Sequence, residues 1–309
     1  MTVRKTLCPK TLADIQSSKG EHIRRTLSWV GMEQIALPIE IAGRPLSARV
    51  NAGINLLAAP QAAKGIHMSR LYLLLDQLTQ QEITPELLRQ TLGAFLDSHG
   101  GQSDSASLSL AGDLLLSRKS LVSNHFGWKA YPIEIQAELT DVFSTVVQVA
   151  IPYSSTCPAS AALSRQLSVE QFQLQFAQAD SEPALEEVSL WLAERGMPAT
   201  PHSQRSWAKV SIRLGQQASE IPIMSLIARC ESALATPVQT VVKRQDEQAF
   251  ALANGQNLMF CEDAVRRLEQ VLSGADFCED FAIQVEHQES LHAHNAVARI
   301  DWKGTHHAA

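Results

Sequence analysis

Hydrophobic positions along this chain recur with two periods, one typical of strands and one typical of helices. In the segment QIALPIEIAG, residues 34–43, apolar residues occupy every second position, which predicts a strand with one buried face. The same alternation occurs at residues 46–56, 106–116, 130–139, 141–151, 207–214, 280–287 and 296–302. Helical spacing occurs at residues 69–78, 86–101, 160–176, 184–196, 222–235 and 257–274. Thr84 and Pro85 mark one helix start, because threonine caps a helix and proline fits its first turn.

The order of these elements suggests an internal repeat. Each half of the chain reads strand, strand, helix, helix, strand, strand, at residues 31–140 and 141–302. Antiparallel strand pairs with helices on one face predict an α+β protein. The pair of helices within residues 160–200 has no counterpart in the first half and is interpreted as a helical insertion. Residues 1–30 are expected to form a loosely packed arm and residues 303–309 a disordered tail.

Composition narrows the class of protein. The 309 residues are 45% hydrophobic and 19% charged, as in ordinary soluble proteins, and the net charge of −6 provides no basic surface for nucleic acid. No apolar run approaches the roughly 20 residues that span a membrane, and the N-terminus lacks the apolar core of a signal peptide. We therefore expect a cytoplasmic protein. The five scattered cysteines argue against a disulfide framework in that compartment.

Four side chains beside predicted strands offer metal-binding chemistry. Cys157 directly follows one strand, His202 precedes another, and Glu289 and His292 precede the last one. One thiolate, two imidazoles and one carboxylate suit zinc or a similar divalent ion and leave a position for water. The residues alone leave a plainer interpretation open, because a cysteine before proline is more often structural and the spacing Glu-x-x-His arises by chance. His294 could simply cap a turn.

Three further groups have chemistry suited to a nucleotide. A polar cluster at a predicted helix start and a later basic pair could bind phosphate, since helix N-termini and basic side chains attract anions. Their residues are Lys64, His67, Ser69 and Arg70 in the cluster, and Lys243 and Arg244 in the pair. Glu262 follows the apolar run LMFC at another helix start, where a carboxylate can accept both N–H donors of a planar base. An ordinary polar helix start explains the Lys64–Arg70 cluster equally well, and for Glu262 the residues alone favour a carboxylate that interacts with the helix dipole.

Taken in order, the strings KGIHMSR, YSSTCP, PHSQRS, VVKRQDEQAF, FCEDAVR and ESLHAHNA resemble the prokaryotic type IB GTP cyclohydrolases over residues 28–302. The resemblance implies the tunnelling fold, with two β-β-α-α-β-β modules per chain. It implies a homo-oligomer, usually a homotetramer, with active sites at subunit interfaces. It also implies conversion of GTP and water to 7,8-dihydroneopterin triphosphate and formate, the first step of tetrahydrofolate synthesis.

The resemblance also assigns roles to the candidate residues. Cys157, His202, Glu289 and His292 match the family's ligands for one divalent metal, which can be zinc, manganese or iron. Cys157, His202 and Glu262 are then catalytic. Glu262 matches the glutamate that anchors guanine, and the Lys64–Arg70 segment and the Lys243–Arg244 pair become candidate triphosphate contacts. His294 is then expected to orient a ligand rather than to bind the metal.

One position departs from the family pattern. The family usually has Cys-Pro-Cys, whereas this chain has Cys157-Pro158-Ala159. A catalytically impaired variant or a non-catalytic metal-binding protein is therefore the main alternative. A second alternative is the related nitrile reductase of queuosine synthesis, which uses a cysteine nucleophile and NADPH. For the cyclohydrolase, opening the guanine ring needs a nucleophile at C8, which water activated by a metal can supply near neutral pH.

Overall fold

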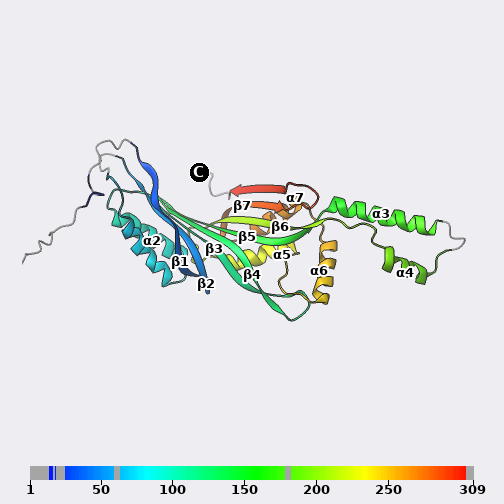
Figure 1. The fold of residues 1–309 in the computed structure, drawn as a ribbon. Helices are drawn as coiled ribbons and strands as arrows, with labels where there is room; N and C mark the ends of the chain where they lie inside the picture. The colour runs from blue at the N-terminus through cyan, green and yellow to red at the C-terminus, as the bar shows by residue number, and fades with distance from the viewer. Residues whose placement is uncertain (1–13, 17, 19–24, 59–62, 178–181, 304–309) are drawn as a thin grey trace, which may run out of the picture. The chain divides into compact units, whose positions relative to one another are not determined.

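Eight strands form one antiparallel sheet in which every strand lies beside its neighbours in sequence (Figure 1). The fold comes from a computed structural model that describes residues 14–16, 18, 25–58, 63–177 and 182–303. The strands are β1 Leu27–Ile41, β2 Arg44–Leu56, β3 Ala106–Lys119, β4 Phe126–Leu139, β5 Phe143–Thr156, β6 Ser203–Leu214, β7 Cys278–His287 and β8 Ala296–Lys303. Each of the eight alternating segments of the sequence is thus confirmed as a strand.

Strand β1 begins at Leu27, earlier than the alternation indicates, so residues 27–30 of the expected arm belong to the sheet. Its pairing with β2 shifts register twice, between Leu27 and Val30 and between Met32 and Ile35. Gln34 lies at the second shift with a positive φ of 61°. An irregularity of this kind offsets the side chains by one residue, so the period of two is lost where the strand begins.

The helices of the first half are α1 Met68–Leu75, the short 3₁₀ helix η1 Asp76–Thr79, and α2 Pro85–Ser98. The Thr84 hydroxyl accepts a hydrogen bond from the Leu87 amide at 3.2 Å, which confirms the predicted cap and proline start of α2. Both α1 and α2 bury leucines, among them Leu71, Leu75 and Leu88, as their helical spacing predicts.

The second half contains one helix that the sequence pattern does not predict. Helices α5 Ile223–Leu234 and α7 Cys261–Leu272 lie where helical spacing places them, but α6 Arg244–Gln256 lies between them. Only one residue of α6, Asp246, is buried. A helix without an apolar stripe gives no hydrophobic period, so its sequence resembles a loop.

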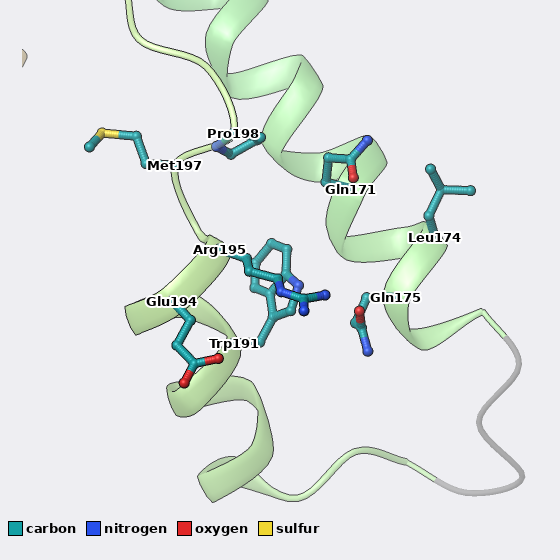
Figure 2. Close-up of a pocket in the computed structure, with 8 residues that line it drawn as sticks. All are labelled: Gln171, Leu174, Gln175, Trp191, Glu194, Arg195, Met197 and Pro198. Carbon is teal, nitrogen blue, oxygen red and sulfur yellow. The ribbon is translucent and has the colours of Figure 1, made fainter.

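The expected insertion is a pair of helices, α3 Pro158–Phe176 and α4 Leu185–Arg195. Phe172 and Phe176 of α3 pack against Trp191 of α4, with ring centroids 5.4 and 6.2 Å from the indole. Trp191 is one of eight residues that line a cavity of about 420 Å³ between the two helices (Figure 2). The aromatic contacts give this helix pair a small core of its own.

The chain divides into two compact units. One contains residues up to 112 with 135–145 and 216–221, and the other contains 113–134, 146–215 and the residues from 222 onward. The four candidate metal ligands, Glu262 and the basic pair all lie in the second unit, whereas the Lys64–Arg70 segment lies in the first. Within the described residues, no helix is long and apolar enough to cross a membrane.

Candidate active site

The ends of β5 and β6 bring Cys157 beside His202. These strands pair antiparallel with Thr156 opposite Ser203, so the residues one step beyond that pair face each other. The Cys157 amide donates to the His202 carbonyl at 3.2 Å, which extends the ladder by one bond. Pro158 then starts α3, leaving half-buried Cys157 at the N-cap position of that helix. The predicted location of the thiol at a strand end is confirmed.

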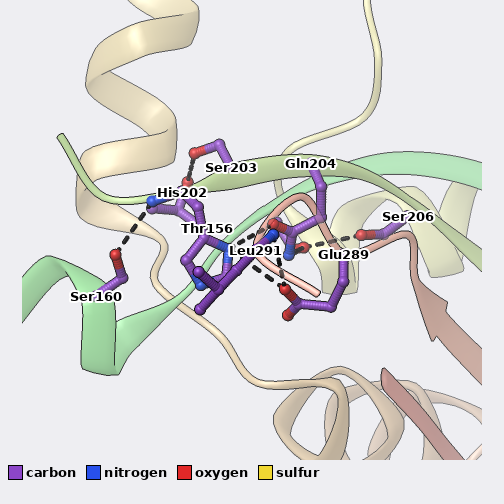
Figure 3. Close-up of polar contacts among 9 residues, drawn as sticks. Thr156, Ser160, His202, Ser203, Gln204, Ser206, Glu289 and Leu291 are labelled. Carbon is purple, nitrogen blue, oxygen red and sulfur yellow. Dashed lines mark hydrogen bonds and ion pairs between the residues drawn. The ribbon is translucent and has the colours of Figure 1, made fainter. Parts of the chain in front are cut away.

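The His202 ring is oriented by a chain of polar side chains (Figure 3). Its Nδ1 lies 3.0 Å from the Gln204 Oε1, and the Gln204 Nε2 donates to the Ser155 hydroxyl at 2.8 Å. Because the amide nitrogen is used by Ser155, the amide oxygen faces His202 and accepts its Nδ1–H. This tautomer leaves the lone pair on Nε2, the form of imidazole that binds metals.

Glu289 reaches the same place from the end of β7. Its Oε2 lies 3.8 Å from the His202 Nδ1, and the two side chains are 13% and 17% exposed (Figure 3). The Glu289 amide donates to the His287 carbonyl at 2.9 Å, and its carboxylate accepts from the Leu291 amide at 3.4 Å. A thiol, an imidazole and a carboxylate from three separate segments therefore lie at one end of three neighbouring strands.

His292, the fourth predicted ligand, is not brought to the other three. Its exposed ring stacks on that of His294, with centroids 4.9 Å apart and an interplanar angle of 7°. Among the described residues, no three His, Cys, Asp or Glu side chains converge closely enough to hold a metal as they stand. The donor types fit a divalent ion such as zinc, but binding would require the side chains to turn, above all in the 288–295 loop. The ligand set stays a prediction.

Glu262 lies in the first turn of α7, whose start is attached to the end of β5. The Met259 amide donates to the Thr156 carbonyl at 3.1 Å, one residue before Cys157. The Glu262 side chain is exposed, and its Oε2 accepts a hydrogen bond from the Cys261 thiol at 3.2 Å. Its own backbone amide and that thiol lower the pKa of Glu262. The carboxylate is thus kept ionised, with its oxygens accessible to a ligand.

Sequence reasoning missed a buried pair beneath these residues. The His287 Nε2 lies 2.8 Å from the Tyr153 hydroxyl, and both residues are at most 4% exposed. Burial lowers the pKa of His287 to about 4, although the carboxylates of Glu289 and Glu262 oppose this shift. The ring is therefore neutral at pH 7. The signal was present in the sequence, because His287 continues the inward-facing series Phe281, Ile283, Val285 of β7.

The cluster in the first compact unit lies at a helix start, as predicted. His67 is the N-cap residue of α1, and its ring lies 3.4 Å from the Asp14 carboxylate. The Arg70 guanidinium donates to the Ser98 carbonyl at 2.5 Å, while Ser69 and Lys64 are exposed. In the second unit, exposed Lys243 and Arg244 occupy the start of α6. Binding of phosphate by either group stays a prediction.

Comparison with known proteins identifies the family. The family model described as type I GTP cyclohydrolase folE2 matches residues 12–298. The chain belongs to the type I GTP cyclohydrolase FolE2 family. It is 66% identical to the GTP cyclohydrolase FolE2 of Citrobacter koseri over 95% of this chain and 98% of that protein. It is 57% identical to the protein of the same name from Serratia proteamaculans over 99% and 100%. The family suggested by the motifs is thereby confirmed.

A solved structure supports the fold independently of sequence. Uricase from Arthrobacter globiformis aligns with a TM-score of 0.50 over 91% of this FolE2 family member and 95% of the uricase chain. At 8% sequence identity, this likeness concerns the fold alone. It agrees with the predicted tunnelling fold of antiparallel strands and helices.

Proposed function

We propose that this GTP cyclohydrolase I holds one divalent metal in the site where it converts GTP and water to 7,8-dihydroneopterin triphosphate and formate. The observation that carries the proposal is that Cys157, His202 and Glu289 lie at the same end of β5, β6 and β7, where the helix that contains Glu262 is attached. Family membership supports the enzymatic activity and the GTP substrate. The metal and the residue roles rest on the chemistry of these side chains.

The residues proposed to hold the metal are Cys157, His202, Glu289 and His292. The chemistry that a divalent metal supplies when bound by such donors is Lewis-acid activation of water at neutral pH. One ligand is positioned before metal binds, because Gln204 accepts from the His202 Nδ1–H and leaves the Nε2 lone pair available. His292 lies on the 288–295 loop, so completing the set would require movement of this loop as well as turning of the other donor side chains.

Glu262 is proposed to select and orient the base. Guanine presents two adjacent donors, N1–H and the exocyclic amine, and an ionised carboxylate can accept from both. The lowered pKa of Glu262 keeps it in that form. Fixing the guanine edge at the start of α7 would direct the opposite, imidazole side of the base away from this helix. This orients C8 for attack before the reaction begins.

The triphosphate contacts are proposed to come from basic residues at helix starts. Lys243 and Arg244 lie at the N-terminus of α6, and Lys64, His67, Ser69 and Arg70 lie at the N-terminus of α1. Unpaired backbone amides and cationic side chains both attract phosphate at such positions. The two groups belong to different compact units.

The sheet has features suited to assembly into a homo-oligomer, which we propose is a homotetramer. Among the described strands, β1 pairs only with β2 and β8 pairs only with β7, so both sheet edges are open except where the Ile83 amide donates to the Glu40 carbonyl of β1. Open edges of long strands present unpaired backbone donors and acceptors that a second copy can satisfy. The proposal places the active sites at the interfaces so formed, and size-exclusion chromatography with light scattering tests the oligomer size.

The proposed reaction is tested by formate release from GTP. The protein is stripped of metal with a chelator, then assayed with zinc, manganese or iron(II), and bound metal is measured in the same samples. We expect turnover only in samples that bind metal, despite alanine at position 159. Full turnover after stripping would contradict the metal dependence, and no formate with any of the three metals would contradict the reaction itself.

A further inference from the structure

Asp246 is a buried carboxylate to which none of the roles above applies. It lies in the first turn of α6, is 0% exposed, and accepts four hydrogen bonds. Its Oδ1 accepts from the amides of Val122 and Ser123, each at 2.8 Å. Its Oδ2 accepts from the Ser123 hydroxyl at 2.6 Å and from the Lys243 amide at 2.8 Å. Both oxygens are fully used, so this carboxylate has no capacity left for a ligand.

These bonds keep Asp246 charged. Burial alone would raise the pKa of Asp246, but the four donors from Ser123, Lys243 and Val122 outweigh it and hold the pKa well below the usual range. A buried anion is tolerated only where such donors compensate for lost hydration. The charged carboxylate therefore holds in place the two segments that donate hydrogen bonds to it.

The donors belong to two segments that are far apart in the sequence, the β3–β4 hairpin and the start of α6. Val122 and Ser123 lie at the tip of the β3–β4 hairpin, and Lys243 is the N-cap residue of α6. Two further contacts join the same segments: the Ser120 hydroxyl donates to the Val241 carbonyl at 2.7 Å, and Thr240 packs against Gly127 so closely that a Cβ there would collide with it. The chain that leads into α6 is thus attached to the hairpin at three successive points.

We infer that Asp246 is a positioning residue, which fixes the backbone of Lys243 and so holds the Lys243–Arg244 pair in place for the triphosphate of GTP. This inference rests on the proposed function. Lysine and arginine side chains are flexible, and binding by them is weakened by the entropy lost on ordering. A rigid backbone at the helix start reduces that loss, because only the side chains remain to be ordered.

Helix α6 connects this pair to the strand that carries the thiol. Near its other end, the side-chain oxygen of Asn254 accepts from the Ser154 hydroxyl at 2.7 Å, three residues before Cys157. From Arg244 to Asn254 the helix rises about 15 Å. A displacement of the first turn of α6 therefore changes the position of the Lys243–Arg244 pair relative to the end of β5.

Replacement of Asp246 by asparagine distinguishes its attachment to the Lys243 amide from its attachment to the β3–β4 hairpin. The new side chain would keep one oxygen and gain an amide donor, which can face the Ser123 hydroxyl because that hydroxyl rotates to accept. The Lys243 amide cannot rotate in this way and would lose its acceptor. Asp246→Asn thus releases the basic pair while keeping the bonds to the hairpin amides. Ser123→Ala instead removes the hydroxyl donor of the hairpin and leaves the bond from the Lys243 amide in place.

The experiment compares Asp246→Asn with two controls in the metal-loaded, full-length protein. Ser123→Ala is the first. Glu231→Gln is the second, since Glu231 is a mostly buried carboxylate of the same unit that accepts from Lys129 at 2.7 Å and Tyr131 at 2.6 Å but has no basic pair beside it in sequence. Thermal melts are recorded for all three, with kcat and KM for GTP. Calorimetric titration with inorganic tripolyphosphate measures the anion contact without turnover.

We expect Asp246→Asn to raise the KM for GTP about tenfold, and to weaken tripolyphosphate binding in parallel, with kcat changed by less than about threefold. Ser123→Ala and Glu231→Gln should lower the melting temperature and leave KM and tripolyphosphate binding unchanged. Adding Asp246→Asn to a Lys243→Ala/Arg244→Ala protein should produce little further loss, because the contact it positions is already gone.

Several outcomes would overturn the inference. Removing a negative charge should by itself favour anion binding, so a KM for GTP that falls or stays unchanged in Asp246→Asn contradicts positioning. An equal rise in KM in Glu231→Gln would assign the effect to general destabilisation. A Lys243→Ala/Arg244→Ala protein with normal KM would remove the contact being positioned. Failure of the proposed reaction is distinguishable, because it appears as absent formate release in the unaltered protein, while the tripolyphosphate titration still tests Asp246.

Discussion

The proposed role of Glu262 as the guanine anchor gives the sharpest test of the site. Glu262→Gln keeps the shape of the side chain but replaces one acceptor oxygen with an amide donor. The guanine edge offers two donors, so one charge-assisted hydrogen bond is lost and a donor then faces a donor. Hydrogen bonds to charged groups contribute about 1.5–3 kcal/mol, and a buried group left unpaired costs a similar amount. We therefore expect kcat/KM for GTP to fall by at least about 100-fold.

The structure predicts that this loss is separable from stability. Glu262 is exposed, and its side chain accepts from the thiol of the neighbouring Cys261, so few native contacts depend on its charge. A carboxylate in the first turn of a helix stabilises it by about 0.3–1 kcal/mol. The expected loss of stability is thus smaller than the loss of transition-state binding, and metal content should be unchanged.

Asp263 provides a matched control for the charge at the start of α7. It is the adjacent carboxylate, it accepts from the Phe260 amide at 3.0 Å, and it caps the same helix. Asp263→Asn removes the charge but keeps an oxygen that can accept from the Phe260 amide, so it should lower stability by about 0.3–1 kcal/mol, the usual effect of a charge at a helix start, and keep GTP turnover. Glu289→Gln is the complementary control, because it should lower metal occupancy while Glu262→Gln does not.

The assay measures formate release from GTP, and ATP competition reports base selectivity. Adenine N1 is an acceptor, so the unaltered site should discriminate against ATP by about 10⁴-fold or more. If Glu262→Gln loses metal and keeps its selectivity for guanine, the two roles have been assigned the wrong way round. If Asp263→Asn loses turnover as severely, the effect belongs to the helix start rather than to a base contact.

Three further predictions concern other parts of the chain. Cys157→Ala should lower metal occupancy and abolish turnover with an unchanged circular dichroism spectrum, and normal metal content would exclude the thiol as a ligand. Trp191→Ala should destabilise the α3–α4 pair by about 3–5 kcal/mol, since the indole is 8% exposed and packs against Phe172 and Phe176, and hydrogen exchange should be faster in these helices alone. Because the pKa of Asp246 is held below that of an unfolded aspartate, about 3.9, its ionised form stabilises the fold above that pH and the stabilisation is lost as pH falls further. Melting temperatures of Asp246→Asn and the unaltered protein should therefore converge in acid, and a constant difference would contradict this assignment.

Elements whose apolar residues recur with a strand or helix period were predictable from the sequence, and the one helix without such a period was missed. The strands and the α5 and α7 helices each show the period of their own geometry. Helix α6 buries only Asp246 and is held at its start by hydrogen bonds, so its sequence contains no period to detect. Strand β1 was placed too late for a related reason, because its register shifts interrupt the alternation before Ile35.

Buried polar pairs formed between distant segments were also missed. Asp246 and Ser123 are 123 positions apart, and Tyr153 and His287 are 134 apart. Nothing in the local sequence around either partner indicates the other. His287 could have been suspected as an inward-facing residue from the alternation of β7. The hydroxyl that meets it depends on the pairing of β5, β6 and β7, which only the assembled sheet specifies.

The same sheet explains why the candidate ligands were predictable to different degrees. Thr156 pairs with Ser203 and Ser206 pairs with His287, so residues just beyond these pairs have positions fixed by backbone hydrogen bonds. Cys157 and His202 lie one step beyond the first pair, and Glu289 lies two steps beyond His287. His292 lies five residues past the end of β7, in a loop whose conformation no strand pairing fixes. The pairing of neighbouring strands was therefore sufficient to bring three donors to the same end of β5, β6 and β7. Placing the fourth depends on interactions of the 288–295 loop itself, so we expect metal binding and a rearrangement of this loop to be one coupled event.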